Sequence, residues 1–110
     1  MSYQHKDMAN GSWQKLSLIE QLTNVGSEVI RALKWKEKKN QQYSQLAFHR
    51  ALELLSLSIN DPKNLYRLKE LTRCYEVIVD YFFGENIYQS NQEQLISYFM
   101  NFNRAARSKN

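Results

Sequence analysis

The chain has little of what shapes other fold classes: one cysteine, one proline and three glycines in 110 residues. A lone cysteine excludes an internal disulfide and a cysteine-based zinc site, and the place of Cys74 in a helical pattern predicts a small buried hydrophobe. Because turn residues are so scarce, no short run of alternating β-branched residues is bounded by turns as a strand would be. These absences favour an all-α protein.

Long apolar runs are missing as well. No stretch approaches the roughly 18 uninterrupted apolar residues of a membrane span, and the polar residues 1–10 do not resemble a signal peptide. We therefore expect a cytoplasmic protein with no membrane partner. A composition of 43% hydrophobic and 24% charged residues is typical of one globular domain. We expect this domain to cover residues 12–107, after a disordered or loosely attached tail at 1–11.

Apolar residues recur every three or four positions in four segments, as amphipathic helices require. The pattern predicts an antiparallel, up-and-down four-helix bundle with helices at about 12–38, 41–60, 62–83 and 91–106. The first start is ambiguous: Ser12 can cap the helix, and Ser17 to Glu20 forms the alternative, a capping box. Gly26 and Ser27 interrupt good helix formers, which indicates either a local weak point or, as we expect, a close helix crossing.

The helix ends carry their own signals. Asp61 can cap the third helix with Pro62 at its first position, Gly84 can end it in a left-handed conformation, and Ser90 to Glu93 reads as a second capping box. The third helix carries Leu65 and Leu71 on its apolar stripe. A short turn at 60–62 favours a hairpin with Phe48 level with Tyr75.

Four stretches are compared with known sequences: Asn24-Val-Gly-Ser-Glu-Val-Ile-Arg-Ala-Leu-Lys-Trp-Lys36, Ala47-Phe-His-Arg-Ala-Leu-Glu-Leu-Leu55, Asp61-Pro-Lys-Asn64 and Val79-Asp-Tyr-Phe-Phe-Gly84. With them the chain resembles, over roughly residues 13–107, a family of short uncharacterised helical proteins from prokaryotes. The resemblance implies the same all-helical fold and brings no activity or binding residues. The stretch 48–54 also looks like the second helix of a tetratricopeptide unit, although the first helix and the repeat are missing.

Recognisable catalytic chemistry is absent from the sequence. The two histidines are His5, in the expected tail, and His49, off the apolar arc of its helix; neither has a glutamate three residues before it, as a di-metal bundle needs. No phosphate-binding loop, dinucleotide fingerprint or zinc spacing occurs. We expect no catalytic residues, no metal and no cofactor, and interpret the protein as a non-enzyme.

A basic cluster ends the first helix. Five bases surround one tryptophan with only Glu37 against them: Arg31, Lys34, Trp35, Lys36, Lys38 and Lys39. Aromatic and cationic side chains together can bind nucleic acid or an acidic protein surface. The alternative is that lysines favour the last turn of a helix because of its dipole, while Trp35 packs on the following loop.

Aromatic residues crowd the last third of the chain. Four of them exceed what a small core needs and are candidates for self-association: Tyr81, Phe83, Tyr88 and Tyr98. Packing within the loop after the third helix is the alternative. The leading hypothesis is a non-catalytic module that binds another protein, with a homodimer expected, and the second is a nucleic-acid-binding accessory protein that uses the cluster around Trp35.

Overall fold

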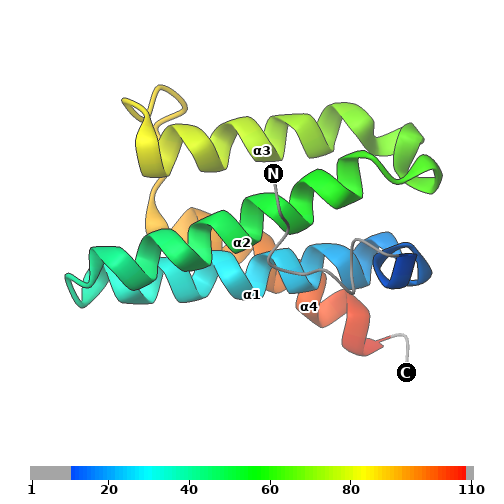
Figure 1. Ribbon diagram of the computed structural model, residues 1–110, viewed down its shortest axis with the longest axis horizontal. Coiled ribbons are helices and arrows are strands. Elements are labelled where there is room, and N and C mark those ends of the chain that lie inside the picture. The colour runs from blue at the N-terminus through cyan, green and yellow to red at the C-terminus, as the bar shows by residue number, and fades with distance from the viewer. Residues whose placement is uncertain (1–10, 109–110) are drawn as a thin grey trace.

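The computed structural model describes residues 11–108, with side chains described for residues 11–102. The α-helices of this part run alternately up and down (Figure 1), and no strand occurs within it. Their bounds are Leu18–Glu37 (α1), Gln41–Ile59 (α2), Leu68–Phe83 (α3) and Gln92–Ser108 (α4), with two 3-10 turns at Trp13–Lys15 (η2) and Pro62–Arg67 (η3). The predicted all-α four-helix bundle is confirmed. The tail expected at 1–11 lies, except for Gly11, outside the described residues.

Helix α1 begins at Leu18, so the predicted start near residue 12 is wrong. Ser12 makes no side-chain capping bond, and the chain is extended at Leu16. The alternative capping box is present: the Glu20 amide donates to Ser17 Oγ at 3.2 Å, and the Ser17 amide donates to Glu20 Oε1 at 2.9 Å. The extended Leu16 separates η2 from α1.

The connection from α2 to α3 differs from a plain hairpin. Asp61 caps as predicted, accepting from the Lys63 amide at 3.2 Å, but Pro62 opens the turn η3 instead of an α-helix. Residues of a 3-10 turn repeat every three positions, not every 3.6. Within η3 it is Asn64 that is buried, while Leu65 is 70% exposed. The prediction that Leu65 belongs to the core is therefore wrong.

The register of α2 against α3 also differs from the prediction. The Phe48 ring centroid lies 4.6 Å from that of Phe82 and 4.7 Å from that of Phe83. Phe82 is about two helical turns beyond Tyr75, the residue expected at this level. The six residues of η3 make the turn itself and do not run back along α2, so α3 starts later than a short hairpin would allow.

The caps at the end of α3 and at the start of α4 also differ from the prediction. Gly84 has φ −94° and does not take the left-handed conformation, which Asn86 (φ 55°) and Gln89 (φ 54°) adopt instead. The capping box of α4 starts one residue later than predicted: the Gln94 amide donates to Asn91 Oδ1 at 2.8 Å, and the Asn91 amide donates to Gln94 Oε1 at 3.1 Å. Asparagine and serine accept equally well at such an end, so local sequence could not choose between Ser90 and Asn91.

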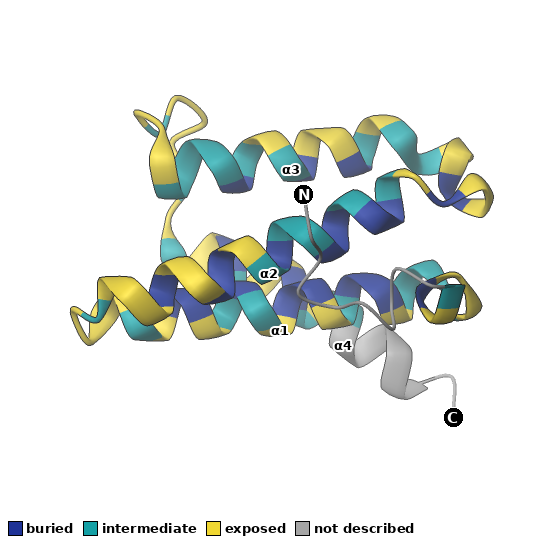
Figure 2. Ribbon diagram, viewed as in Figure 1, coloured by how far each residue is buried: buried dark blue, intermediate teal, exposed yellow. Residues whose placement is uncertain are grey.

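The core lies where the predicted apolar stripes meet. Helix α1 packs against both α2 and α4, and α3 packs mainly on α2. Buried residues follow the inward faces of the helices, and exposed residues cover the outer side of α3 (Figure 2). The largest fully buried apolar side chains are Trp13, Phe48, Phe99, Leu22, Leu33, Leu55, Leu71 and Ile78. Cys74 is buried too, as predicted.

Gly26 is the contact point between α1 and α4. A Cβ atom built on Gly26 would lie 2.6 Å from Phe99 Cβ and 2.9 Å from Phe99 Cγ, closer than real Cβ contacts come. The predicted close crossing at Gly26 is therefore confirmed, and the partner is the Phe99 side chain.

A buried polar network lies where α1 begins and α2 ends. Gln21 Nε2 donates to Asp61 Oδ2 and to the Trp13 carbonyl, both at 2.9 Å, and Gln21 Oε1 accepts from Asn64 Nδ2 at 2.8 Å. The Trp13 indole donates to Ser58 Oγ at 3.0 Å. This network fastens η2 and η3 to α1 and α2. The sequence interpretation missed it, because Trp13 precedes the periodic region and Gln21 is a polar residue on a buried face.

Asp61 stays ionised within this network. Burial alone would raise the pKa of its carboxyl, but hydrogen bonds from Lys63 and Gln21 outweigh burial and hold the pKa below its ordinary value. The Lys63 ammonium also pairs with Asp61 and donates to the Gln14 carbonyl at 3.0 Å. One lysine thus joins the first residues of η3 to the end of η2.

We expect Gly26→Ala to lower the free energy of unfolding by about 1–3 kcal/mol, because the methyl group would force Phe99 and α4 away from α1. This loss should appear although alanine favours a helix over glycine by about 1 kcal/mol. Urea denaturation measures the difference. The matched control is Ser27→Ala, one residue further and exposed, which should change stability by less than about 0.5 kcal/mol. A Gly26→Ala variant as stable as the control would show that the crossing is not tight.

Candidate functional site

Trp35 is the centre of the predicted basic cluster, and it packs on the first turn of α2. Its ring centroid lies 4.9 Å from that of Tyr43, edge to face at 77°. Lys38 Nζ lies 5.3 Å from the centroid of the Trp35 ring, within the range of a cation–π contact. Trp35 is half-buried, while Lys38 and Tyr43 are exposed. These three side chains form one aromatic and cationic surface, which we call the Trp35 patch.

The remaining bases of the predicted cluster diverge. Arg31 NH1 lies 3.1 Å from Glu28 Oε1, so its charge faces a carboxylate. Lys36 Nζ lies 4.6 Å from the centroid of the Tyr81 ring, on the side of α1 that faces α3. Neighbouring residues of a helix point about 100° apart, which is why Lys36 leaves the face of Trp35. Lys34 is exposed on α1.

Lys39 adopts a backbone conformation that favours glycine. Its φ is 63°, and the bonds that follow are those of a helix end in the left-handed form: the Asn40 amide donates to the Trp35 carbonyl at 2.9 Å. A lysine here is strained relative to glycine, since its Cβ crowds the backbone in this region.

The four aromatic residues predicted for self-association lie in separate places. Tyr88 Oη donates to Glu76 Oε2 at 3.1 Å, and Phe83 packs on Phe48 and His49. Tyr81 lies beneath Lys36, at the end of α3 next to α1. Tyr98 lies on α4 and borders a cavity between α3 and α4. The four therefore do not form one surface.

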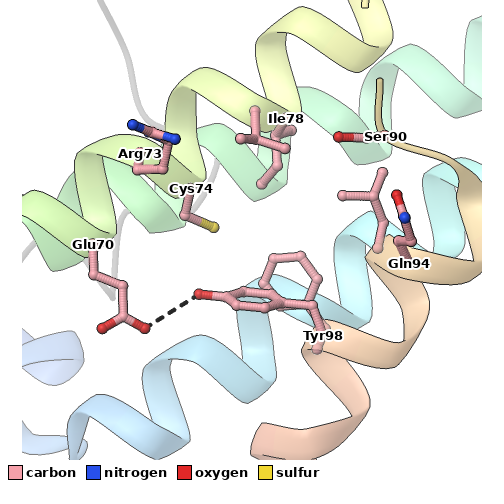
Figure 3. Close-up of a pocket in the computed structure, with 10 residues that line it drawn as sticks. Glu70, Arg73, Cys74, Ile78, Ser90, Gln94 and Tyr98 are labelled. Carbon is pink, nitrogen blue, oxygen red and sulfur yellow. Dashed lines mark hydrogen bonds between the residues drawn. The ribbon is translucent and has the colours of Figure 1, made fainter. Parts of the chain in front are cut away.

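A cavity of about 300 Å³ separates α3 from α4 (Figure 3). Its apolar wall comes from both helices: Cys74, Val77, Ile78, Leu95 and Phe99. Glu70, Arg73, Ser90, Gln94 and Tyr98 complete the lining, and Figure 3 shows the Cys74 sulfur and the Tyr98 ring on its opposite sides. Sequence periodicity gave no sign of this cavity, because it depends on the distance between two helices.

The polar end of the cavity is formed by Tyr98 and Glu70. Tyr98 Oη donates to Glu70 Oε1 across a long 3.5 Å, while Arg67 pairs with Glu70 Oε2. Burial raises the pKa of the Cys74 thiol to about 12, although a hydrogen bond with Tyr98 acts in the opposite direction. Burial, followed by the nearness of Cys74 and Glu70, also raises the pKa of Tyr98. Both groups are therefore protonated near neutral pH, and the thiol lacks the thiolate character of a nucleophile.

The described residues offer little for metal or membrane chemistry. They contain no group of three or more His, Cys, Asp or Glu side chains that could hold a metal ion. None of the helices seen in residues 11–108 has the length and apolar character that crossing a bilayer requires.

No family model, curated protein or solved structure matches the chain. The resemblance to short helical prokaryotic proteins therefore stays a prediction.

We expect Lys39→Gly to raise the free energy of unfolding by about 1 kcal/mol, since glycine takes φ 63° without strain. Lys38→Gly is the control at the adjacent position, where φ is −79° and no strain is relieved. Urea denaturation of both variants separates relief of strain from loss of a positive charge. Equal effects of the two substitutions would show that Lys39 is not strained.

Proposed function

We propose that this protein is a cytoplasmic, non-catalytic module that binds other proteins, and that it forms a homodimer. The observation that carries the proposal is a pair of neighbouring apolar side chains on η3. Leu65 is 70% exposed and Tyr66 is 75% exposed. Single exposed apolar residues are ordinary, but a large aliphatic residue beside a tyrosine has the composition of an interface centre.

The surroundings of this pair suit a second copy of the chain. Arg67 and Glu70 lie beside it and pair with each other, which gives the apolar residues a polar border like the rim of an interface. Tyr98 approaches the same place through its bond to Glu70. We call Leu65, Tyr66, Arg67 and Glu70 the η3 surface. Of the four aromatic residues proposed for self-association, Tyr98 is the one that borders it.

We expect light scattering at micromolar concentration to give about twice the chain mass of 13.1 kDa. The double variant Leu65→Ser, Tyr66→Ser should return the mass to that of a monomer, because it removes the apolar centre of the interface. Helix content should be unchanged, since both side chains are exposed and contribute little to the core.

The matched control is Ile87→Ser. Ile87 is 77% exposed but lies in the loop at the opposite end of α3, so its loss should leave a dimer intact. A monomeric wild type would contradict the homodimer proposal. Dissociation by Ile87→Ser alone would move the interface away from the η3 surface.

A second candidate function rests on the Trp35 patch. Lys38 above the Trp35 ring, beside Tyr43, combines a positive charge with aromatic faces, which is how many proteins bind single-stranded nucleic acid. Lys34 and Lys39 lie close to Trp35 in the chain and add positive charge. Arg31 contributes less, because Glu28 faces it.

For this candidate we expect affinity for a labelled single-stranded RNA or DNA to fall steeply with salt, because bound lysines release counterions. Replacing Lys34, Lys38 and Lys39 by glutamine should weaken binding of all sequences and flatten the salt dependence. Trp35→Ala should cost about 1–3 kcal/mol of binding if a base stacks on the ring.

The control for charge is Lys36→Gln, which removes a lysine of the same helix end that points toward Tyr81. Thermal unfolding of each variant must accompany the titrations, since Trp35 also packs on Tyr43 and lost stability would imitate lost affinity. If the wild type shows no salt-sensitive binding at low ionic strength, the nucleic-acid candidate fails.

A further inference from the structure

The cavity between α3 and α4 has a predominantly apolar lining, and neither proposed function accounts for it. Its space of about 300 Å³ is partly open at the surface, so its apolar walls face water, which is unfavourable. Ligand pockets share these features, since they are largely apolar, pre-formed and carry a few polar groups.

The volume indicates the size of the ligand. An apolar cavity of about 150 Å³ holds a benzene molecule, so about twice that volume is sufficient for a bicyclic aromatic ring. The walls suit such a ring: Phe99 and Tyr98 offer aromatic contacts, and Cys74 offers a polarisable sulfur. In Figure 3 the Cys74 sulfur is directed across the cavity toward the Tyr98 side.

The charges at the polar end indicate the polarity of the ligand. Arg67 compensates the carboxylate of Glu70, while the Arg73 guanidinium lies over the Tyr88 ring and is directed away from the cavity (Figure 3). The Tyr98 hydroxyl donates its hydrogen to Glu70, which leaves oxygen lone pairs as acceptors beside the cavity. A neutral ligand with one N–H or O–H donor matches this arrangement.

We propose that the α3–α4 cavity binds a small neutral aromatic molecule, with its ring between Cys74 and Phe99 and a single N–H or O–H group donating to Tyr98 Oη. The site is separate from the Trp35 patch and shares Glu70 with the η3 surface. Apolar side chains would contact the ring, and the single hydrogen bond would give the site its specificity.

Indole is the probe, and titration is followed by the NMR shifts of the full chain. We expect saturable shifts at Cys74, Val77 and Leu95 in the wild type. Benzothiophene has nearly the same shape but no N–H group, and it should bind about fivefold more weakly, the equivalent of one hydrogen bond. In Tyr98→Phe the two probes should bind equally, a result that a merely structural role of Tyr98 would not produce.

Filling the cavity tests its location. Cys74→Phe should weaken indole binding at least about tenfold while the helical spectrum is kept, because the added ring occupies the site. Val77→Phe fills the same space from the neighbouring turn of α3 and serves if the first variant does not fold. Thr72→Ala, exposed on α3 and outside the cavity, should bind like the wild type. Absence of saturable shifts with millimolar indole, or unchanged binding in both filled variants, would overturn the proposal.

Discussion

The contact between Gly26 and Phe99 is the constraint on which the arrangement of the bundle depends. It lets α4 approach α1 more closely than any side chain at position 26 would allow. The position of α3 is set elsewhere, by Phe48 against Phe82 and Phe83. Because α4 packs on α1 and α3 on α2, the two helices α3 and α4 pack little on each other, and the bond from Tyr98 to Glu70 is one link between them. The cavity between them is a consequence of where the two close contacts lie.

Hydrogen bonds instead of close packing set the arrangement where α1 begins and α2 ends. Gln21 is buried and connects Trp13, Asp61 and Asn64, which belong to three separate segments. Once Asp61 and Asn64 are directed inward, the tight turn between them sends the next two residues outward. The exposure of Leu65 and Tyr66 therefore follows from pairing the buried Gln21 with Asp61 and Asn64, since unpaired burial is costly, although Asn64 Oδ1 has no partner. A structural requirement has created the surface that we propose for self-association.

The sequence was sufficient for features that depend on local periodicity and insufficient for those that depend on neighbouring helices. The number of helices, most of the inward stripes and the close crossing at Gly26 were predicted from signals within single segments, whereas the starts of α1 and α3 were not. The level of Phe48 against α3 was not, since it depends on how many residues η3 uses. The basic cluster was predicted as one group, yet a rotation of 100° per residue separates Lys36 from Trp35. The cavity gave no sequence signal, because its size depends on the distance between two helices.

The three candidate sites occupy different parts of the bundle, and this separation is what allows their functions to be told apart. The Trp35 patch joins the end of α1 to the start of α2, whereas η3 joins the end of α2 to the start of α3. In an antiparallel hairpin these are opposite ends of α2 (Figure 1). Substitutions at distant sites usually act additively, so a change at one surface should leave binding at the other unaltered. The cavity borders Glu70, which also belongs to the η3 surface, so a ligand there could influence self-association through Tyr98 and Glu70 while the Trp35 patch stays independent.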